Sequence, residues 1–291
     1  MVNVVWLILV VLTLIGWGFG DFFLQRSVRK IGDWETLFIV TFIGAIALTP
    51  FIFHDFSAIF SNENNILIVL LFTSVILFGA ALLDFEALKK GKLAVVEPIW
   101  SLEIIASSVL AFFIIHEKLN SLQITLMTFL ILGLVLVSLR SYHFDKRIWL
   151  EKGVFLAILS AIVMGSANFF IGLGSRESNG LMVNWFLNCF MAISCLIYIV
   201  YNRKFKKMIR DFRKSKKEVM AICFFDNMAW IAFAIAMTLA SISITVAITE
   251  SYIILAVLLG IFAGKEKIKF HQKIGLVFAV LSAIYLAYSV G

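Results

Sequence analysis

Long apolar runs, separated by short polar connections, repeat along the whole chain. Each run is close to the ~20 residues that a helix needs to cross a hydrocarbon core of about 30 Å. We expect helices near residues 4–24, 35–53, 65–88, 93–114, 121–139, 152–173, 181–201, 218–239, 242–263 and 273–290. The pattern therefore predicts an all-α, polytopic membrane protein with ten transmembrane helices.

The composition agrees with this interpretation. The 291 residues are 62% hydrophobic and 15% charged, whereas a soluble domain is roughly half apolar and a quarter charged. The basic residues that raise the pI to 9.3 lie in short connections, where they face headgroups, so we expect membrane lipid and no nucleic acid as a partner. The first apolar run lacks the basic start and cleavage pattern of a signal peptide, and we expect it to be retained as a helix.

Lys and Arg residues also predict an orientation. The chain has 25 Lys and Arg residues, and 23 of them lie in connections that follow odd-numbered helices or at the edges of these connections. The two exceptions are Lys118 and Arg176. The positive-inside rule then places both termini outside the cytoplasm of a multi-pass protein in the plasma (inner) membrane.

An internal repeat relates the two halves of the chain. Residues 18–23 (GFGDFF) correspond to residues 165–170 (GSANFF), and HEKL at 116–119 corresponds to KEKI at 265–268, each followed by a glutamine, Gln123 and Gln272. We expect a first five-helix repeat at 1–139, a linker at 140–151 and a second repeat at 152–291. Because five is odd, the two repeats would be inverted relative to each other.

These residues also carry a family resemblance. The chain resembles the drug/metabolite transporter superfamily, in its EamA-like ten-helix branch, through the turn Gly16-Trp17-Gly18 and an acid-Lys-aliphatic sequence after the fourth and ninth helices. The resemblance covers essentially the whole chain and implies two inverted repeats around a central cavity that opens alternately to each side. Many members of that family are thought to keep both termini in the cytoplasm, opposite to the charge count here.

Acidic side chains inside the predicted helices are the main candidates for function, because a charge in hydrocarbon costs about 2.5 to 3.5 kcal/mol on insertion scales. Glu103, Asp226 and Glu250 lie far from any Lys or Arg in the sequence, and Asp21 lies five residues before Arg26. Three further acids flank the basic connection at 89–92, and we interpret them as ion-pair partners at the membrane surface. They are Asp84, Glu86 and Glu97.

Tryptophans accompany these acids at helical spacing. Trp17, Trp100 and Trp230 lie three or four residues from Asp21, Glu103 and Asp226, so each shares a helix face with a carboxylate. An indole beside a carboxylate suits an amine or quaternary ammonium ion, although such pairs also arise by accident. With Asn168, the repeat equivalent of Asp21, the predicted substrate-binding residues are Trp17, Asp21, Trp100, Glu103, Asn168, Asp226, Trp230 and Glu250.

The predicted function is a secondary-active transporter of a small organic solute, a cation or amine. A carboxylate in a poorly hydrated cavity can exchange a proton for a cation, so proton coupling is one hypothesis and gradient-driven facilitation is the other. The alternative is an exporter of amino acids or other neutral or zwitterionic metabolites, with Asn168, Asn188 and Asn227 meeting a carboxylate. Phosphorylated or nucleotide sugars are disfavoured because no Lys or Arg lies in the middle of a helix.

An enzyme is the remote alternative. Residues 18–21 spell the GxGD sequence of intramembrane aspartyl proteases, but the second Tyr-Asp of that class is missing, since Leu83 and Phe225 precede Asp84 and Asp226. We expect no catalytic residue, cofactor or metal site. The four histidines fall at segment ends or in connections, and we expect them at the surface.

Overall fold

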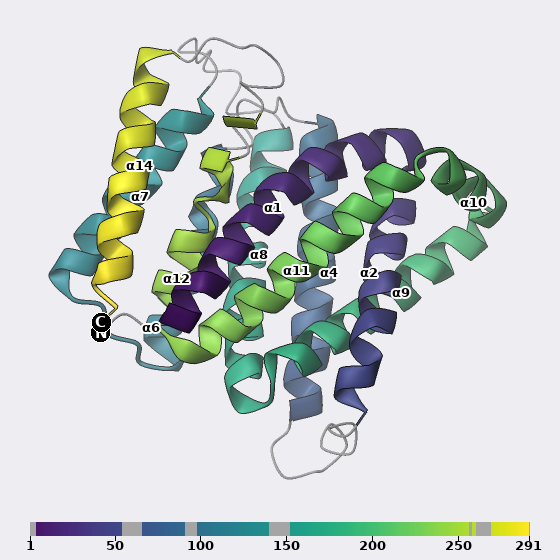
Figure 1. Cartoon of the computed structure of the whole chain (residues 1–291), viewed down its shortest axis with the longest axis horizontal. Coiled ribbons are helices and arrows are strands. Elements are labelled where there is room, and N and C mark those ends of the chain that lie inside the picture. The colour runs from purple at the N-terminus through teal and green to yellow at the C-terminus, as the bar shows by residue number, and fades with distance from the viewer. Residues whose placement is uncertain are drawn as a thin grey trace.

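The computed structural model describes residues 4–53, 66–90, 98–139, 152–255, 258–259 and 269–290, and every regular element in them is a helix (Figure 1). Eight helices are long and apolar enough to cross a membrane, by length and composition. The helices are α1 (Val4–Ile31), α2 (Asp33–Ile52), α4 (Ile66–Lys90), α6 (Leu102–Ile114), α7 (Ser121–Ser138), α8 (Lys152–Glu177), α9 (Gly180–Tyr201), α10 (Phe205–Lys214), α11 (Lys216–Leu239), α12 (Ile242–Thr249) and α14 (Phe270–Tyr288).

In two of the ten predicted crossings, the described residues form apolar helices of fewer than 18 residues. The fourth is helical over Pro98–Ile114 and the ninth over Ile242–Leu255. In the ninth, the helix ends at Thr249, a turn follows at Glu250 and Ser251, and the chain is helical again from Tyr252. Ten uninterrupted helices are therefore not what the structure shows. Hydropathy alone did not reveal the turn because the residues around it are apolar.

The strongly basic connection after the seventh predicted helix contains an additional helix, α10. Its apolar residues follow helical spacing, and Met208 is buried while the Lys and Arg residues lie exposed on the opposite side. This helix was not among the predicted elements. An amphipathic helix of this kind suits the boundary between headgroups and water.

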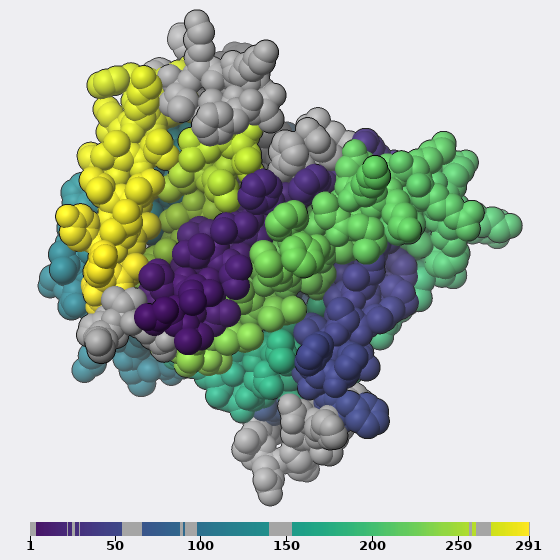
Figure 2. Space-filling view, in the orientation of Figure 1, coloured from purple at the N-terminus to yellow at the C-terminus, as the bar shows by residue number. Residues whose placement is uncertain are grey.

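The helices of the two halves pair across the molecule. α1 packs along α11 and α4 packs along α8, while α2 packs against α9 and α7 against α14. In the repeat, α1 corresponds to α8 and α4 corresponds to α11, so exchanging the two halves converts the α1–α11 pair into the α8–α4 pair. The α2–α9 and α7–α14 pairs each join corresponding helices and are unchanged by the exchange. A two-fold axis produces this relation, and it supports the predicted duplication. Figure 2 shows α1 and α11 side by side across one face of the molecule.

The α7 and α14 pair shows the same relation in its hydrogen bonds. Gln123, near the start of α7, donates to the carbonyl oxygen of Ser289 at 3.2 Å, just past the end of α14. Gln272, near the start of α14, donates to the carbonyl oxygen of Val137 at 3.0 Å, near the end of α7. The two glutamines that marked the repeat in the sequence thus hold the ends of an antiparallel helix pair together.

Glycine allows this pair to pack closely. A Cβ atom on Gly275 would lie 2.7 Å from the carbonyl oxygen of Gly133, and one on Gly133 would lie 2.6 Å from the backbone nitrogen of Ala279. Both distances are too short for a real contact. Small residues at helix contacts are typical of membrane proteins, where close van der Waals packing replaces the hydrophobic effect.

Large apolar side chains cover the outer surfaces of the helices. Phe51, Phe113 and Phe155 are 67%, 68% and 67% exposed on three different helices. In water, so many exposed aromatic side chains would favour aggregation, whereas in a bilayer they contact lipid tails. The outer surface therefore agrees with a multi-pass membrane protein.

Candidate functional site

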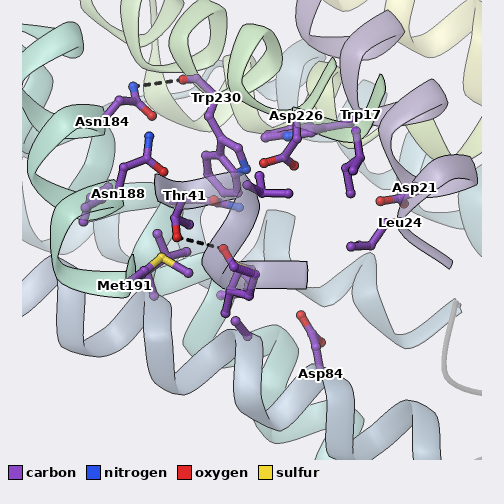
Figure 3. Close-up of a pocket in the computed structure, with 18 of the residues that line it drawn as sticks. Trp17, Asp21, Leu24, Thr41, Asp84, Asn184, Asn188, Met191, Asp226 and Trp230 are labelled. Atoms are coloured by element: carbon purple, nitrogen blue, oxygen red, sulfur yellow. Dashed lines mark hydrogen bonds between the residues drawn. The ribbon is translucent and has the colours of Figure 1, made fainter. Parts of the chain in front are cut away.

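A cavity of about 230 Å³ lies between the two halves, where α1, α2, α4, α6, α8, α9 and α11 surround it (Figure 3). All of the predicted substrate-binding residues line this one cavity: Trp17, Asp21, Trp100, Glu103, Asn168, Asp226, Trp230 and Glu250. They come from both repeats, so the site forms only when the halves are assembled.

Acidic side chains are the most unusual feature of the lining. Asp21 on α1, Asp84 on α4 and Asp226 on α11 point their carboxylates toward the same space from three sides (Figure 3). Glu103 and Glu250 complete the set of acids. The described lining residues include no Lys, Arg or His. The cavity is therefore lined by carboxyl groups from both halves, and a cation is the kind of ligand that such a lining suits.

Asp84 was predicted to pair with a basic residue at the membrane surface, and this was wrong. It lines the cavity and accepts a hydrogen bond of 2.5 Å from the hydroxyl of Ser160. Glu86, two residues later, pairs with Lys90 at 2.7 Å as expected. Glu86 and Lys90 are four residues apart, so their pairing on one helix face could have been predicted from the sequence. Residues two apart in a helix point in nearly opposite directions, so Asp84 would then point away from that face. Glu97 lies outside the described residues.

Glu103 and Asn168 form a buried pair between α6 and α8. The amide nitrogen of Asn168 lies 3.3 Å from a carboxylate oxygen of Glu103, and the two residues are 1% and 7% exposed respectively. The side-chain oxygen of Asn168 is buried and has no hydrogen-bond partner among the described residues. α8 can approach this closely because Gly165 has no side chain, and a Cβ there would lie 2.5 Å from the backbone oxygen of Glu103.

Aromatic rings form one wall of the cavity. The ring of Trp17 contacts those of Trp230, Phe233 and Tyr252, at centroid distances of 5.1, 4.8 and 5.6 Å. The tryptophans of α1 and α11 therefore meet each other, as well as lying beside their carboxylates. Trp100 also lines the cavity, on the same side as Asp84 and Glu103. Edge-to-face packing of this kind holds the indoles rigidly beside the acids.

The glycines around Trp17 explain how it reaches this position. A Cβ on Gly16 would lie 2.6 Å from the Cβ of Ala229, and one on Gly18 would lie 2.6 Å from a methyl group of Leu255. The Gly-Trp-Gly sequence thus brings α1 against α11 and the ninth segment. These contacts show that the glycines allow close packing of the helices.

Glu250 is the C-cap of the short helix α12, and Glu117 holds the opposite end of that helix. The carboxylate of Glu117 accepts hydrogen bonds from the hydroxyl of Ser241 at 2.6 Å and from the backbone nitrogens of Ile242 and Ser243 at 2.9 and 3.0 Å. An anion at a helix N-terminus is favoured by the free N–H groups and the helix dipole. We call these contacts the α12 latch.

Arg176 supports the latch from α8. Its guanidinium donates to the backbone oxygens of Met237 and Ala240, at 2.9 and 2.6 Å, and lies 3.9 Å from Glu117. Burial tends to raise the pKa of Glu117, but the hydrogen bonds from Ser241, Ser243 and Ile242 outweigh it and lower that pKa below its ordinary value of 4.5.

Polar side chains from α2 and α9 form a further wall of the cavity, which was not predicted from the sequence. Thr41, Asn184 and Asn188 line the cavity, and we call them the amide wall. A signal existed, because Asn184 and Asn188 are four residues apart and share a helix face. Neutral polar residues in a membrane helix cost less than acids, so they stood out less. Asn188 had been considered only as a contact for a substrate carboxylate.

One prediction about the histidines was wrong. His271 is 5% exposed, and its Nε2 lies 2.8 Å from the backbone oxygen of Leu139. It lies at the start of α14, where the end of α7 covers it, so a position at a segment end did not place it at the surface. His116 is exposed as expected, and the other two histidines lie outside the described residues.

Comparison with known proteins agrees with the architecture. The EamA-like transporter family matches twice, at residues 4–139 and 151–288. A crystal structure of a protein with 15% sequence identity superposes with a TM-score of 0.74, and the match covers 97% of this chain and 96% of that one. At that identity the likeness shows the fold alone. No curated protein matches the sequence. Since the two family matches together cover nearly the whole chain, the protein belongs to the EamA-like transporter family.

Proposed function

We propose that this protein is a secondary-active transporter that moves a small organic cation or amine across the cell membrane by alternating access. One observation carries the proposal. Asp21, Asp84, Glu103, Asp226 and Glu250 line one cavity, with no Lys or Arg among the described lining residues. Carboxylates are costly to keep in a membrane, and a cationic substrate offsets that cost each time it binds.

The aromatic wall supports a cation specifically. Trp17 and Trp230 meet at 5.1 Å and both line the cavity with the acids. The negative face of an indole attracts a cation within about 6 Å, by roughly 2 kcal/mol or more where water is excluded. An acidic cavity without indoles would suit a metal ion or water equally well. The combination favours an organic cation with an apolar part.

Proton exchange is the proposed energy source. A carboxylate that binds either a proton or a cation, but not both, couples the two movements in opposite directions. The acids that converge on the cavity are suited to this role. With a proton gradient imposed, uptake of an amine into proteoliposomes should exceed uptake at equal pH on both sides. Equal rates would leave facilitated diffusion as the mechanism.

The cation proposal is tested by replacing acids inside and outside the cavity. Asp226→Asn and Asp84→Asn should each reduce amine uptake into proteoliposomes by about tenfold or more, because each removes a charge that faces the substrate. Glu86→Gln, on the same helix as Asp84, is the matched control, since Glu86 pairs with Lys90 away from the cavity. If amines neither bind nor cross, or if anions alone are transported, the proposal is wrong.

The orientation remains part of the proposal. The surplus of Lys and Arg in the connections after odd-numbered helices places both termini on the non-cytoplasmic side. α1 begins and α14 ends at the same end of the molecule (Figure 1), which agrees with an even number of crossings. A reporter fused to the C-terminus, active only outside the cytoplasm, should be active. Activity of a cytoplasmic reporter instead would reverse the orientation.

A further inference from the structure

The amide wall has a fixed hydrogen-bonding polarity, because each amide is oriented by groups that cannot change role. Both N–H groups of Asn227, behind the wall, donate to backbone oxygens: Val40 at 3.1 Å and Cys223 at 2.9 Å. A backbone oxygen only accepts, so the amide of Asn227 cannot be flipped. Its side-chain oxygen is therefore the atom that faces Asn188.

The orientation of Asn188 follows from that of Asn227. The amide nitrogen of Asn188 donates to the side-chain oxygen of Asn227 at 3.1 Å. The carbonyl oxygen of the Asn188 side chain is left for the cavity, together with one N–H. Asn184 is fixed in the same way, since its nitrogen donates to the backbone oxygens of Gly180 at 2.8 Å and Trp230 at 3.1 Å.

Thr41 completes the wall with the same polarity. Its hydroxyl proton is used on the backbone oxygen of Leu37 at 2.7 Å, so toward the cavity the hydroxyl oxygen acts as an acceptor. Among the described residues, no donor bonds to the side-chain oxygen of Asn184 or Asn188. In Figure 3 both of these oxygens point toward the ring of Trp230. The wall therefore offers three acceptor oxygens and a single N–H.

The pair formed by Asn188 and Asn227 has a dedicated place against α2. A Cβ atom on Gly44 would lie 2.5 Å from the amide nitrogen of Asn188 and would overlap the side-chain oxygen of Asn227. Only glycine leaves room for both amides at this point. The amide wall is thus held from behind by a backbone position that does not itself line the cavity.

We infer that the amide wall is a second recognition point for N–H donors, and that the site therefore selects amines carrying a second donor group, such as diamines. This inference rests on the proposed function, since the acids would bind the first ammonium group. A substrate carboxylate would face the acids on one side of the cavity and the acceptor oxygens of the amide wall on the other. The wall would offer it a single N–H donor. A quaternary ammonium ion has no N–H to give to the wall. The same cavity thus discriminates among cations and against amino acids.

Three probes of matched length test this selection. 1,4-Diaminobutane carries a donor at each end, n-butylamine lacks the second donor, and 4-aminobutanoate has a carboxylate in its place. In competition for binding to the purified protein, the diamine should bind about tenfold more tightly than butylamine, as expected for one charge-assisted hydrogen bond. 4-Aminobutanoate should bind more weakly than either.

Variants assign the preference to the amide wall. Asn188→Leu should lower the affinity for the diamine about tenfold and leave that for butylamine unchanged. Gly44→Ala should have the same effect by displacing the amide pair, and it keeps every lining residue. Asn202→Leu, at the exposed C-cap of the same helix α9, is the matched control and should bind all three probes as the unsubstituted protein does.

The outcomes separate this inference from the proposed function. Equal binding of diamine and butylamine, or a diamine preference that survives both Asn188→Leu and Gly44→Ala, overturns the selection while amine transport stands. Tight binding of 4-aminobutanoate overturns it as well. If no amine binds, and if Asp226→Asn also has no effect on amine uptake into proteoliposomes, the proposed function itself is overturned.

Discussion

Removal of the α12 latch should destabilise the protein by an amount that can be worked out from its contacts. The carboxylate of Glu117 accepts three hydrogen bonds at 2.6, 2.9 and 3.0 Å, and its side chain is 12% exposed. Bonds to a charged group contribute roughly 1.5–3 kcal/mol each, and bonds that share one acceptor group do not add fully. We expect Glu117→Leu to cost about 3 kcal/mol and Glu117→Gln about half of that.

Thermal unfolding in detergent measures this loss. For a chain of this size, about 1 kcal/mol corresponds to roughly 2–4 °C in Tm, so Glu117→Leu should melt about 6–12 °C lower. Glu177→Leu is the matched control, because Glu177 is exposed at the end of α8, beside Arg176. A Glu117→Leu variant that melts within about 2 °C of the control would show that the latch does not hold α12.

The latch also predicts a pH dependence with a definite sign. The pKa of Glu117 is lowered below 4.5 in the folded protein, so its stabilising effect is fully present above that value. As the pH falls from 4.5 through the lower folded pKa, the carboxylate takes up a proton and the stabilisation is lost. The difference in Tm between the unsubstituted protein and Glu117→Gln should therefore shrink in acid. A difference that stays constant down to about pH 3 would contradict the assignment of the low pKa to this group.

Two further substitutions test the packing that positions the cavity. Trp17→Ala removes a ring that contacts Trp230, Phe233 and Tyr252. We expect the free energy of unfolding, measured by denaturation, to fall by about 3–5 kcal/mol. Cation binding, measured by ligand titration, should also weaken. Trp17→Phe should recover most of the stability, and equal effects of the two would argue against ring packing. Gly275→Val should lower Tm by separating α7 from α14, because a Cβ atom at position 275 would lie 2.7 Å from the carbonyl oxygen of Gly133. It should not change which amines bind, because Gly275 does not line the cavity. A changed ligand preference in Gly275→Val would show that this helix pair shapes the site.

The energetic cost of charge in a membrane explains why so much of the cavity could be predicted from the sequence. Glu103, Asp226 and Glu250 were selected because no Lys or Arg lies nearby in the sequence, and Asp21, which lies closer to a basic residue, was selected together with Trp17 on the same helix face. All four acids line the cavity. Membrane helices have no water to satisfy a carboxylate on the lipid side, so acids point inward. The same reasoning failed for Asp84, because nearness to lysines in the sequence does not say which side of the helix faces them.

Contacts between distant segments were beyond the sequence. Glu117 lies in a connection of the first half and binds the start of α12, more than 120 residues away. Its place in the repeated HEKL sequence marked it without indicating its partner. Arg176 was one of two exceptions to the charge bias, and its bonds to the backbone oxygens of Met237 and Ala240 supply a structural reason. A basic group at a helix C-terminus is stabilised there whichever side of the membrane it faces.

The short helix α12 connects the latch to the cavity and relates stability to transport. One of its ends is held by Glu117 of the first half, and the other presents Glu250 to the cavity. Under the proposed alternating access, opening of the cavity on the side of the latch would separate the ends of α6 and α12 and break bonds that join the two halves. If those bonds are absent from the opposite conformation, the latch favours the conformation described here. Glu117→Gln should then raise the population of the opposite conformation, and acid should do the same in the unsubstituted protein.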